Sequence, residues 1–192
     1  MANGLLRSLL GAARGGRSAP RALAVVSGAV APFLVPVEWS PKRRLVSVVE
    51  LAEAEASLPR VAALVGDVRA VRSGAGAVAA ARRALELVQR LPYVPDPPGD
   101  DTHQGAEYTA TRGGDCEDLS ALLWLLFTRG AGLRARVLWL EQRGAALSHV
   151  TSQALAAGQW EWAEACVAGA RFGEYPYDAV RRLGAGVRGL EV

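Results

Sequence analysis

Residues 113–120 read Gly113-Gly114-Asp115-Cys116-Glu117-Asp118-Leu119-Ser120, and a leucine-rich run follows them as far as Gly130 and Gly132. This pattern predicts a buried helix over residues 116–129 that begins at Cys116 and ends at the two glycines. A helix N-terminus offers partial positive charge and unpaired backbone N–H groups, which stabilise a thiolate and bind an oxyanion. The acids around Cys116 oppose a negative sulfur, so a cysteine nucleophile at this position requires a cationic partner.

The cationic partner is predicted on the strands that follow this helix. Alternation of side chains predicts strands over residues 134–141, 147–155 and 159–166, and residues 156–158 join the last two as a hairpin. His149 lies in the second strand and Glu164 in the third. A two-residue connection puts the two side chains opposite each other, a four-residue connection puts them on a diagonal, and a three-residue loop puts them on opposite faces. On a shared face, Glu164 would orient His149, which would take the proton of Cys116.

The residues before Cys116 are predicted to be mostly helical. Apolar spacing predicts helices over residues 45–56, 59–71 and 77–91, and the third is amphipathic. Its expected inward positions are Val78, Ala81, Leu85, Val88 and Leu91. Four prolines predict a long loop over residues 92–114. Loops of this length within a compact domain often have a function. The fold class is therefore α+β, with a helical N-terminal half and a buried helix carrying Cys116 packed on an antiparallel sheet.

The first 44 residues are predicted to form a basic and apolar arm. They carry a net charge of +6, which leaves −3 for residues 45–192. The apolar stretch 22–37 is shorter than a membrane span and is cut by Pro32 and Pro36, so we expect no membrane span. A secretory signal or a transit peptide is an alternative, but Pro32 disfavours cleavage after Ala31. We expect the arm to pack on its own domain or on other subunits of an assembly. A nucleic-acid partner is not expected, because the excess charge is confined to this arm.

Several motifs in order resemble the transglutaminase-like superfamily of papain-like cysteine enzymes, in its short bacterial and tailed-phage form. The similar segments, which span roughly residues 75–180, are Leu91-Pro92-Tyr93-Val94-Pro95-Asp96, Gly114–Ser120, Leu125–Arg136, Ser148-His149-Val150, Trp160-Glu161-Trp162-Ala163-Glu164 and Gly173-Glu174-Tyr175-Pro176. The resemblance implies Cys116 as nucleophile, His149 as base and Glu164 as the third member, where the family usually has Asp. Asp115, Tyr93 and Trp162 complete the site as predicted substrate-binding residues.

We expect three parts: an arm over residues 1–44, a helical extension over 45–74 and a domain over 75–192 that the resemblance implies to be transglutaminase-like. Residues 1–74 have no counterpart in the minimal core of the family. The implied activity is that of a cysteine hydrolase or acyltransferase, which acts on peptide bonds or Gln side-chain amides through a thioester on Cys116. The alternative is a non-catalytic scaffold in the virion or tail of a phage-like particle. The expected location is the cytoplasm, or a particle assembled there.

The other thiol and histidine are predicted to have lesser roles. Two cysteines cannot build a disulfide framework and indicate free thiols in a reducing compartment. Cys166 is expected to be a small strand residue, and His103 to be exposed or to face the substrate. A zinc site formed by Cys116, His149 and Cys166 lacks the usual ligand spacing, so no metal and no cofactor are expected.

Overall fold

The computed structural model describes residues 25–26, 29–30, 32–35, 40–142, 148–174 and 187–191. The elements are β1 (Val25–Val26), β2 (Ala29–Val30), β3 (Phe33–Leu34), α2 (Pro41–Ala54), α3 (Pro59–Ala75), α4 (Ala77–Gln89), β4 (Thr102–His103), α5 (Ala106–Arg112), α6 (Cys116–Leu125), the π-helical η1 (Leu126–Ala131), β5 (Ala135–Gln142), β6 (Ser148–Ala156), β7 (Gln159–Ala163) and β8 (Val187–Glu191). Most of the predicted arm, including residues 1–24, and the Tyr175-Pro176 part of the last motif lie outside the described residues.

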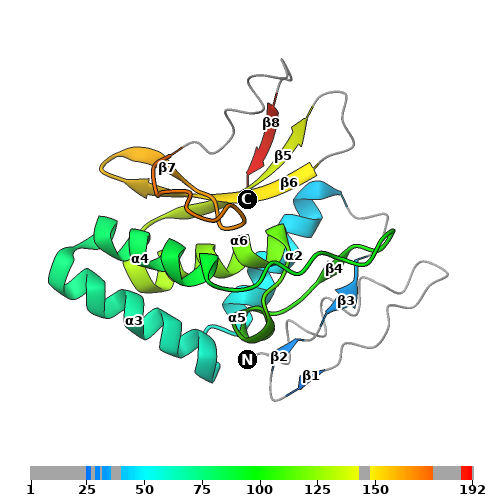
Figure 1. Cartoon of the computed structure of the whole chain (residues 1–192), viewed down its shortest axis with the longest axis horizontal. Helices are drawn as coiled ribbons and strands as arrows, with labels where there is room; N and C mark the ends of the chain where they lie inside the picture. Colours follow the sequence, from blue (N-terminus) through cyan, green and yellow to red (C-terminus); the bar gives the residue numbers. More distant parts are fainter. Residues whose placement is uncertain are drawn as a thin grey trace.

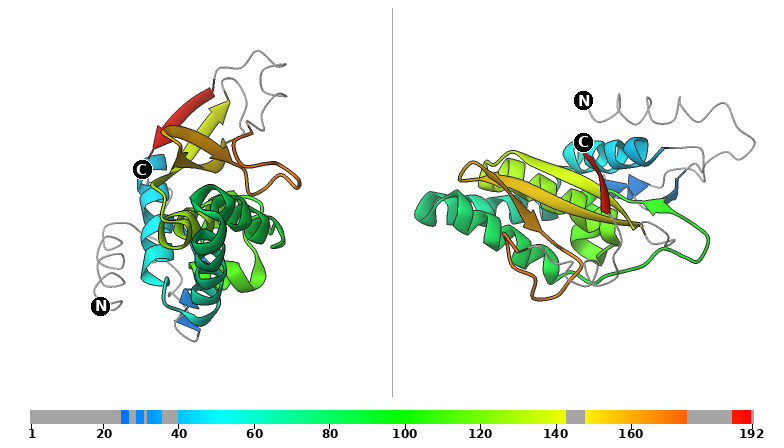
Figure 2. Two further views of the ribbon diagram at one scale, coloured as in Figure 1. Left: turned by 90° about the vertical axis from the view of Figure 1, so that its left-hand side faces the viewer. Right: turned by 90° about the horizontal axis from the view of Figure 1, so that it is seen from above.

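The architecture has two layers, an antiparallel sheet above a layer of helices (Figure 1). The sheet has the strand order β7-β6-β5-β8, and every neighbouring pair is antiparallel. The views from the side and from above show the sheet lying across the helices, with α6 beneath it (Figure 2). The predicted α+β class, with the Cys116 helix packed on an antiparallel sheet, is confirmed.

The core lies between α6 and its neighbours. Leu119, Leu122 and Leu123 of α6 are buried in one cluster with apolar side chains of α2, α3 and α4. Ser120 Oγ donates to the Val150 carbonyl at 3.1 Å, and Ser152 Oγ donates to the Ser120 carbonyl at 3.0 Å. These two bonds hold the first turns of α6 against β6, because buried hydroxyl groups require partners.

Residues in the range predicted as a helical extension share this core. Val48 of α2 and Val61, Val65 and Val68 of α3 are buried in the same cluster as the α6 leucines. The division of the chain at residues 44 and 74 stays a prediction. Part of the predicted arm also pairs within the chain, since β3 runs antiparallel to β4 and the Val35 amide donates to the Asp101 carbonyl at 2.7 Å.

Three details of the predicted elements are wrong. The loop predicted over residues 92–114 contains the helix α5, which Gly105 and Gly113 bracket and which is too short to show a clear period. The third predicted strand stops at Ala163, so Glu164 and Cys166 follow it. Val78 is 38% exposed, and the inner face of α4 instead uses Ala80, Ala81, Ala84, Leu85 and Val88.

Within the described ranges, no helix is both long and apolar enough to cross a membrane.

Candidate active site

Cys116 is the first residue of α6, and Asp115 caps the helix by accepting from the Asp118 amide at 3.5 Å. The Cys116 thiol is half-buried and donates to Glu117 Oε2 at 3.1 Å. Burial and the carboxylates of Glu117 and Asp115 raise the pKa of this thiol, and the Val150 backbone amide at the sulfur lowers it by less. The resting residue is therefore a neutral thiol, because burial and the neighbouring acids outweigh the helix N-terminus.

The predicted pair of His149 and Glu164 is present. His149 Nε2 lies 2.9 Å from Glu164 Oε2, and Glu164 is completely buried. Glu164 Oε1 accepts from the Cys166 amide at 2.7 Å, so both oxygens of this carboxylate have partners. A buried carboxylate held in this way orients an imidazole, which is the role predicted for Glu164.

The hairpin explains how these two side chains meet. Ala156 pairs with Gln159, so the turn consists of Ala157 and Gly158. A connection of two residues keeps His149 and Glu164 on one face, as the two-residue alternative predicted. They lie on a diagonal rather than directly opposite, because the turn consists of residues 157 and 158, whereas direct opposition would need a turn at residues 156 and 157.

Val150 links the environment of Cys116 to the His149–Glu164 pair. The Val150 backbone lowers the pKa of the Cys116 thiol, and Val150 follows His149 directly in β6. Val150 packs with Cys116 and Trp139 on the side of the sheet that faces α6. Side chains alternate along a strand, so the His149 side chain leaves β6 in a different direction from that of Val150. The structure thus brings His149 to Glu164, while the hydrogen bond of the Cys116 thiol goes to Glu117.

An acidic pocket of about 330 Å³ opens beside Cys116. Its lining consists of Arg44, Asp96, Asp100, Asp101, Asp115, Cys116, Glu117, Trp139 and Val150. Burial is the main reason that the pKa of Asp115 rises to about 10, with neighbouring acids adding to it. Burial also raises the pKa values of Glu117 and Asp118. Arg44 supplies a cation at this pocket and is paired with Asp101.

His103 is not exposed, contrary to the prediction. It is 1% exposed, with Nδ1 2.8 Å from Ser47 Oγ and Nε2 3.8 Å from Glu117 Oε1. Burial and the nearby Arg44 lower the pKa of His103 to about 3, so this imidazole is neutral at physiological pH. It lies next to Glu117 and is not among the residues that line the acidic pocket, because pairing of β3 with β4 carries it into the interior.

Of the three predicted substrate-binding residues, only Asp115 is among the residues that line the acidic pocket. Tyr93 bridges Gly114 through its backbone and is 52% exposed. Burial is the main reason that the pKa of its phenol is raised, and the nearby Cys116 and Cys166 add to this effect. Trp162 lies in β7 and is not among the residues that line the pocket.

Three groups of side chains could hold a metal ion among the described residues. They are Asp115, Cys116 and Glu117; Asp101, His103 and Glu117; and His149, Glu164 and Cys166. In the last group, His149 lies in β6, and Glu164 and Cys166 lie on the segment that follows β7. No sequence spacing indicated this group, because the hairpin register alone brings Cys166 to His149. Glu117 as the partner of the thiol was also missed, since adjacency in sequence does not say where a side chain points.

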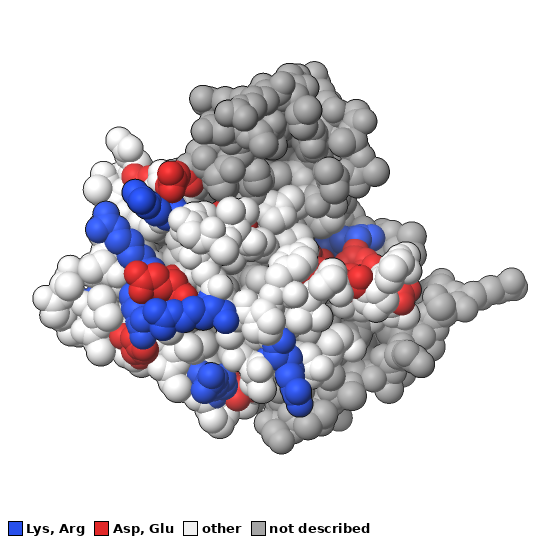
Figure 3. Space-filling view, in the orientation of Figure 1, with Lys and Arg blue, Asp and Glu red and all other residues white. Residues whose placement is uncertain are grey.

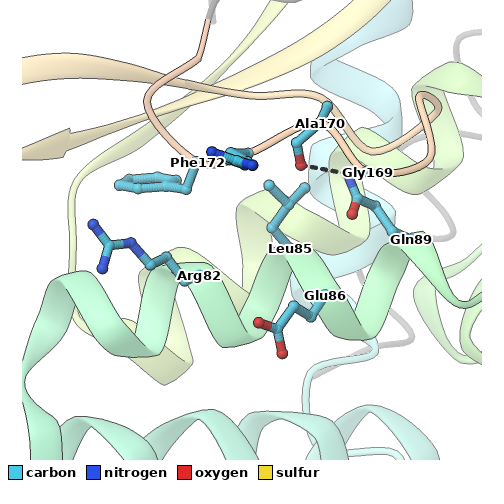
Figure 4. A pocket seen from close by; sticks show the side chains of 8 residues that line it. Arg82, Leu85, Glu86, Gln89, Gly169, Ala170 and Phe172 are labelled. Carbon is cyan, nitrogen blue, oxygen red and sulfur yellow. Dashed lines mark hydrogen bonds between the residues drawn. The ribbon is translucent and has the colours of Figure 1, made fainter.

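A second pocket, of about 380 Å³, lies between α4 and the segment after β7. Figure 4 shows Leu85 and Gln89 of α4 pointing toward the segment with Ala170 and Phe172, whereas Glu86 points away from it. Gln89 Nε2 donates to the carbonyls of Glu164, Val167 and Ala170 at 2.9, 3.1 and 3.0 Å. One α4 side chain thus anchors the segment that carries Glu164 and Cys166.

Charged side chains are mixed on the face shown in Figure 3, where basic and acidic groups interleave over α3 and α4. Arg83 illustrates this mixture, since it pairs with Asp67 at 2.7 Å and with Glu86 at 3.7 Å.

Comparison with known proteins gives one structural likeness. No protein-family model matches the chain, and no curated protein matches its sequence. A solved structure described as a "Putative Cysteine Protease from Cytophaga hutchinsonii" is similar at 16% identity, with a TM-score of 0.36. The match covers 83% of this chain and 56% of that one, so the chain spans little more than half the length of that protein. The protein described here is an α+β protein with a cysteine at the start of its central helix.

Proposed function

We propose that this protein is a transglutaminase-like cysteine hydrolase or acyltransferase that acts on peptide bonds or Gln side-chain amides. One observation carries the proposal. His149 and Glu164 form an imidazole–carboxylate pair, and the residue after His149, Val150, packs with a cysteine at a helix N-terminus, Cys116. Nucleophile, base and orienting group are the parts that covalent catalysis by cysteine needs.

The proposed reaction runs through a thioester. His149 takes the proton of Cys116, and the sulfur attacks the carbonyl carbon of the amide. Backbone N–H groups at the start of α6 stabilise the oxyanion of the tetrahedral intermediate. The imidazolium then protonates the leaving amine as the C–N bond breaks. Water or a second amine, deprotonated by His149, attacks the thioester and releases the acyl group, which restores the thiol.

The resting site must rearrange before this reaction can begin. The Cys116 thiol has to exchange Glu117 for His149 as its hydrogen-bond partner. Substrate binding in the acidic pocket beside Cys116 is the proposed trigger, because a bound carbonyl would displace water and move the thiol from Glu117. A protein or peptide is the proposed substrate, and residues 1–44 are the proposed contact with other subunits.

The test is to trap the acyl-enzyme. The full chain is incubated with libraries of peptides and Gln-containing amides together with hydroxylamine, and both the hydroxamate product and the intact protein mass are measured. The expected result is turnover that Cys116→Ser abolishes, that His149→Gln lowers about 100-fold or more, and that Glu164→Gln lowers about tenfold. Glu161→Gln, in the same strand region, is the matched control and should retain activity.

A non-catalytic scaffold is the second candidate, and the neutral thiol beside Glu117 favours it. In this case the fold would serve assembly, for example in a virion or tail, and the site would be inert. Absence of an acyl-enzyme with every library, or turnover that survives His149→Gln, would contradict the proposed enzymatic activity. Co-assembly that is lost when residues 1–44 are removed would then support the scaffold.

A further inference from the structure

Three side chains of different chemistry converge beside the sheet end that carries His149. The ligand atoms of His149, Glu164 and Cys166 all lie within 4.8 Å of one another. The register of β6 and β7 ends at Ser152 and Ala163, and Glu164 and Cys166 follow within three residues. The hairpin therefore returns these two residues to the part of β6 that carries His149.

The chemistry of this group is that of a zinc ligand set. Zn²⁺ takes thiolate sulfur at about 2.3 Å and imidazole nitrogen or carboxylate oxygen at about 2.0–2.2 Å, in a tetrahedron. Ligand atoms around such an ion lie roughly 3.3–3.7 Å apart, as these bond lengths require. The observed spread is close enough that small side-chain rotations would bring the three groups to bonding distance. Three protein ligands leave one position open.

Charge and burial favour a cation at this place. Glu164 is completely buried, and its Oε2 lies 2.9 Å from His149 Nε2. A divalent cation attracts a buried carboxylate and a thiolate beside it, so it favours a site that contains both groups.

The backbone around the group is already held in place. The Cys166 amide donates to Glu164 Oε1, and Gln89 Nε2 donates to the carbonyls of Glu164, Val167 and Ala170, of which the Ala170 bond is drawn in Figure 4. Partners of this kind fix ligand orientation and raise metal affinity. Two of the ligands are therefore carried on a segment that α4 anchors.

We propose that His149, Glu164 and Cys166 form a binding site for Zn²⁺ or a similar thiophilic divalent ion. On binding, the Cys166 thiol releases its proton to solvent and its sulfur bonds the metal. Glu164 binds through a carboxylate oxygen, and neutral His149 binds through Nε2 with its proton on Nδ1. His149 then has no lone pair with which to accept the Cys116 proton. The ion would therefore inhibit the proposed reaction, a consequence that rests on the proposed function, whereas the binding does not.

Co²⁺ titration of the full chain tests the site, because a thiolate–Co²⁺ bond gives a strong near-ultraviolet charge-transfer band. We expect the band in the wild-type chain and in Cys116→Ser. It should vanish in Cys166→Ser, and Co²⁺ affinity should fall at least tenfold in Glu164→Gln. A band that needs Cys116 instead would assign the metal to the group of Asp115, Cys116 and Glu117. That result, or no band in the wild-type chain, would overturn the proposal.

A second measurement needs no variant and so does not depend on variant folding. Zn²⁺ should protect Cys166 of the wild-type chain from iodoacetamide, with the modified residue identified by peptide mass spectrometry. Unprotected Cys166 at saturating Zn²⁺ contradicts the site. If Zn²⁺ protects Cys166 in a chain without turnover, the metal site stands and the proposed function fails. If Zn²⁺ inhibits wild-type and Cys166→Ser turnover equally, inhibition does not occur through this site.

Discussion

At the scale of single residues, the hydrogen bond from the Cys116 thiol to Glu117 decides the state of the candidate nucleophile. Glu117 acts on the thiol twice, as a charge and as a hydrogen-bond acceptor, and both raise the thiol pKa. We therefore expect Glu117→Gln to lower the pKa of Cys116, because the charge is removed while the size of the side chain is kept. Alkylation of Cys116 by iodoacetamide at pH 7 should become several-fold faster, measured as a rate constant from pH 6 to 9 by peptide mass spectrometry.

Glu86→Gln is the matched control for this variant. Glu86 is an exposed residue of α4 that is not among the residues lining the pocket beside Cys116, and the same loss of charge there should leave the Cys116 rate unchanged. An unchanged or slower rate in Glu117→Gln would contradict the assignment of Glu117 as the group that keeps the sulfur protonated.

The pairing of His149 with Glu164 could be predicted from the sequence, because strand alternation has a fixed period and leaves few possible registers. The partner of Cys116 could not, since it depends on one rotamer of Glu117. His103 shows the same limit. Its place in an acidic, proline-rich segment predicted exposure, but pairing of β3 with β4 buries it beside Ser47.

At the scale of elements, the β6–β7 hairpin carries a local strain. Ala157 has a φ of 49° and Gly158 a φ of 81°, the two positive values that a two-residue type I′ turn requires. Glycine adopts a positive φ without strain and alanine does not. We expect Ala157→Gly to raise the free energy of unfolding by about 0.5–1 kcal/mol, measured by urea unfolding.

The control replaces alanine by glycine at an exposed loop position without a positive φ, as Ala168→Gly. The unfolded chain gains the same freedom in both variants, but only Ala157→Gly relieves strain in the folded state. Ala168→Gly should therefore lower stability slightly. Equal effects in the two variants would refute the strain at Ala157.

The contact of η1 with α3 leaves no room for a side chain at Gly130. A Cβ atom there would lie 2.7 Å from Val68 Cγ1 and 2.8 Å from Val68 Cβ, and Val68 is fully buried. We expect Gly130→Ala to destabilise the protein by about 1–3 kcal/mol, because the branched Val68 side chain cannot move away. Gly66→Ala, at an exposed position of α3 with open space around it, should instead stabilise by about 0.5–1 kcal/mol. A thermal melt of both variants checks the opposite signs.

Some secondary-structure elements could be predicted from the sequence and one helix could not. The helix at Cys116, its termination at Gly132 and the order of strands β5 to β7 could be predicted, because each has a strong period and explicit end signals. The seven-residue helix α5 could not, since Glu55 and Gly105 support it from outside. The Glu107 amide donates to Glu55 Oε2, and the Glu107 carboxylate in turn accepts from the first amides of α3.

At the scale of the whole molecule, the buried charges around the site make stability depend on pH. Asp115, Glu117 and Asp118 all have pKa values raised by burial, and that of Asp115 is about 10. The stability they contribute is fully present below their unfolded pKa values, near 4, and is lost as pH rises through the folded values. His103 acts in the opposite direction, but only between its folded pKa of about 3 and its unfolded value of 6.5.

The acids therefore act without opposition from His103 above pH 6.5, and the free energy of unfolding should fall from pH 6.5 to 8. Each fully shifted carboxyl contributes about 1.4 kcal/mol per pH unit to this loss. Urea unfolding at several pH values measures it, and Asp118→Asn should flatten the slope by up to one such contribution because it removes a titrating group but keeps the shape. Asp100→Asn, at an exposed position, should keep the wild-type slope. Stability that stays level or rises from pH 6.5 to 8 would contradict the raised pKa values of the three buried carboxyls in the folded protein.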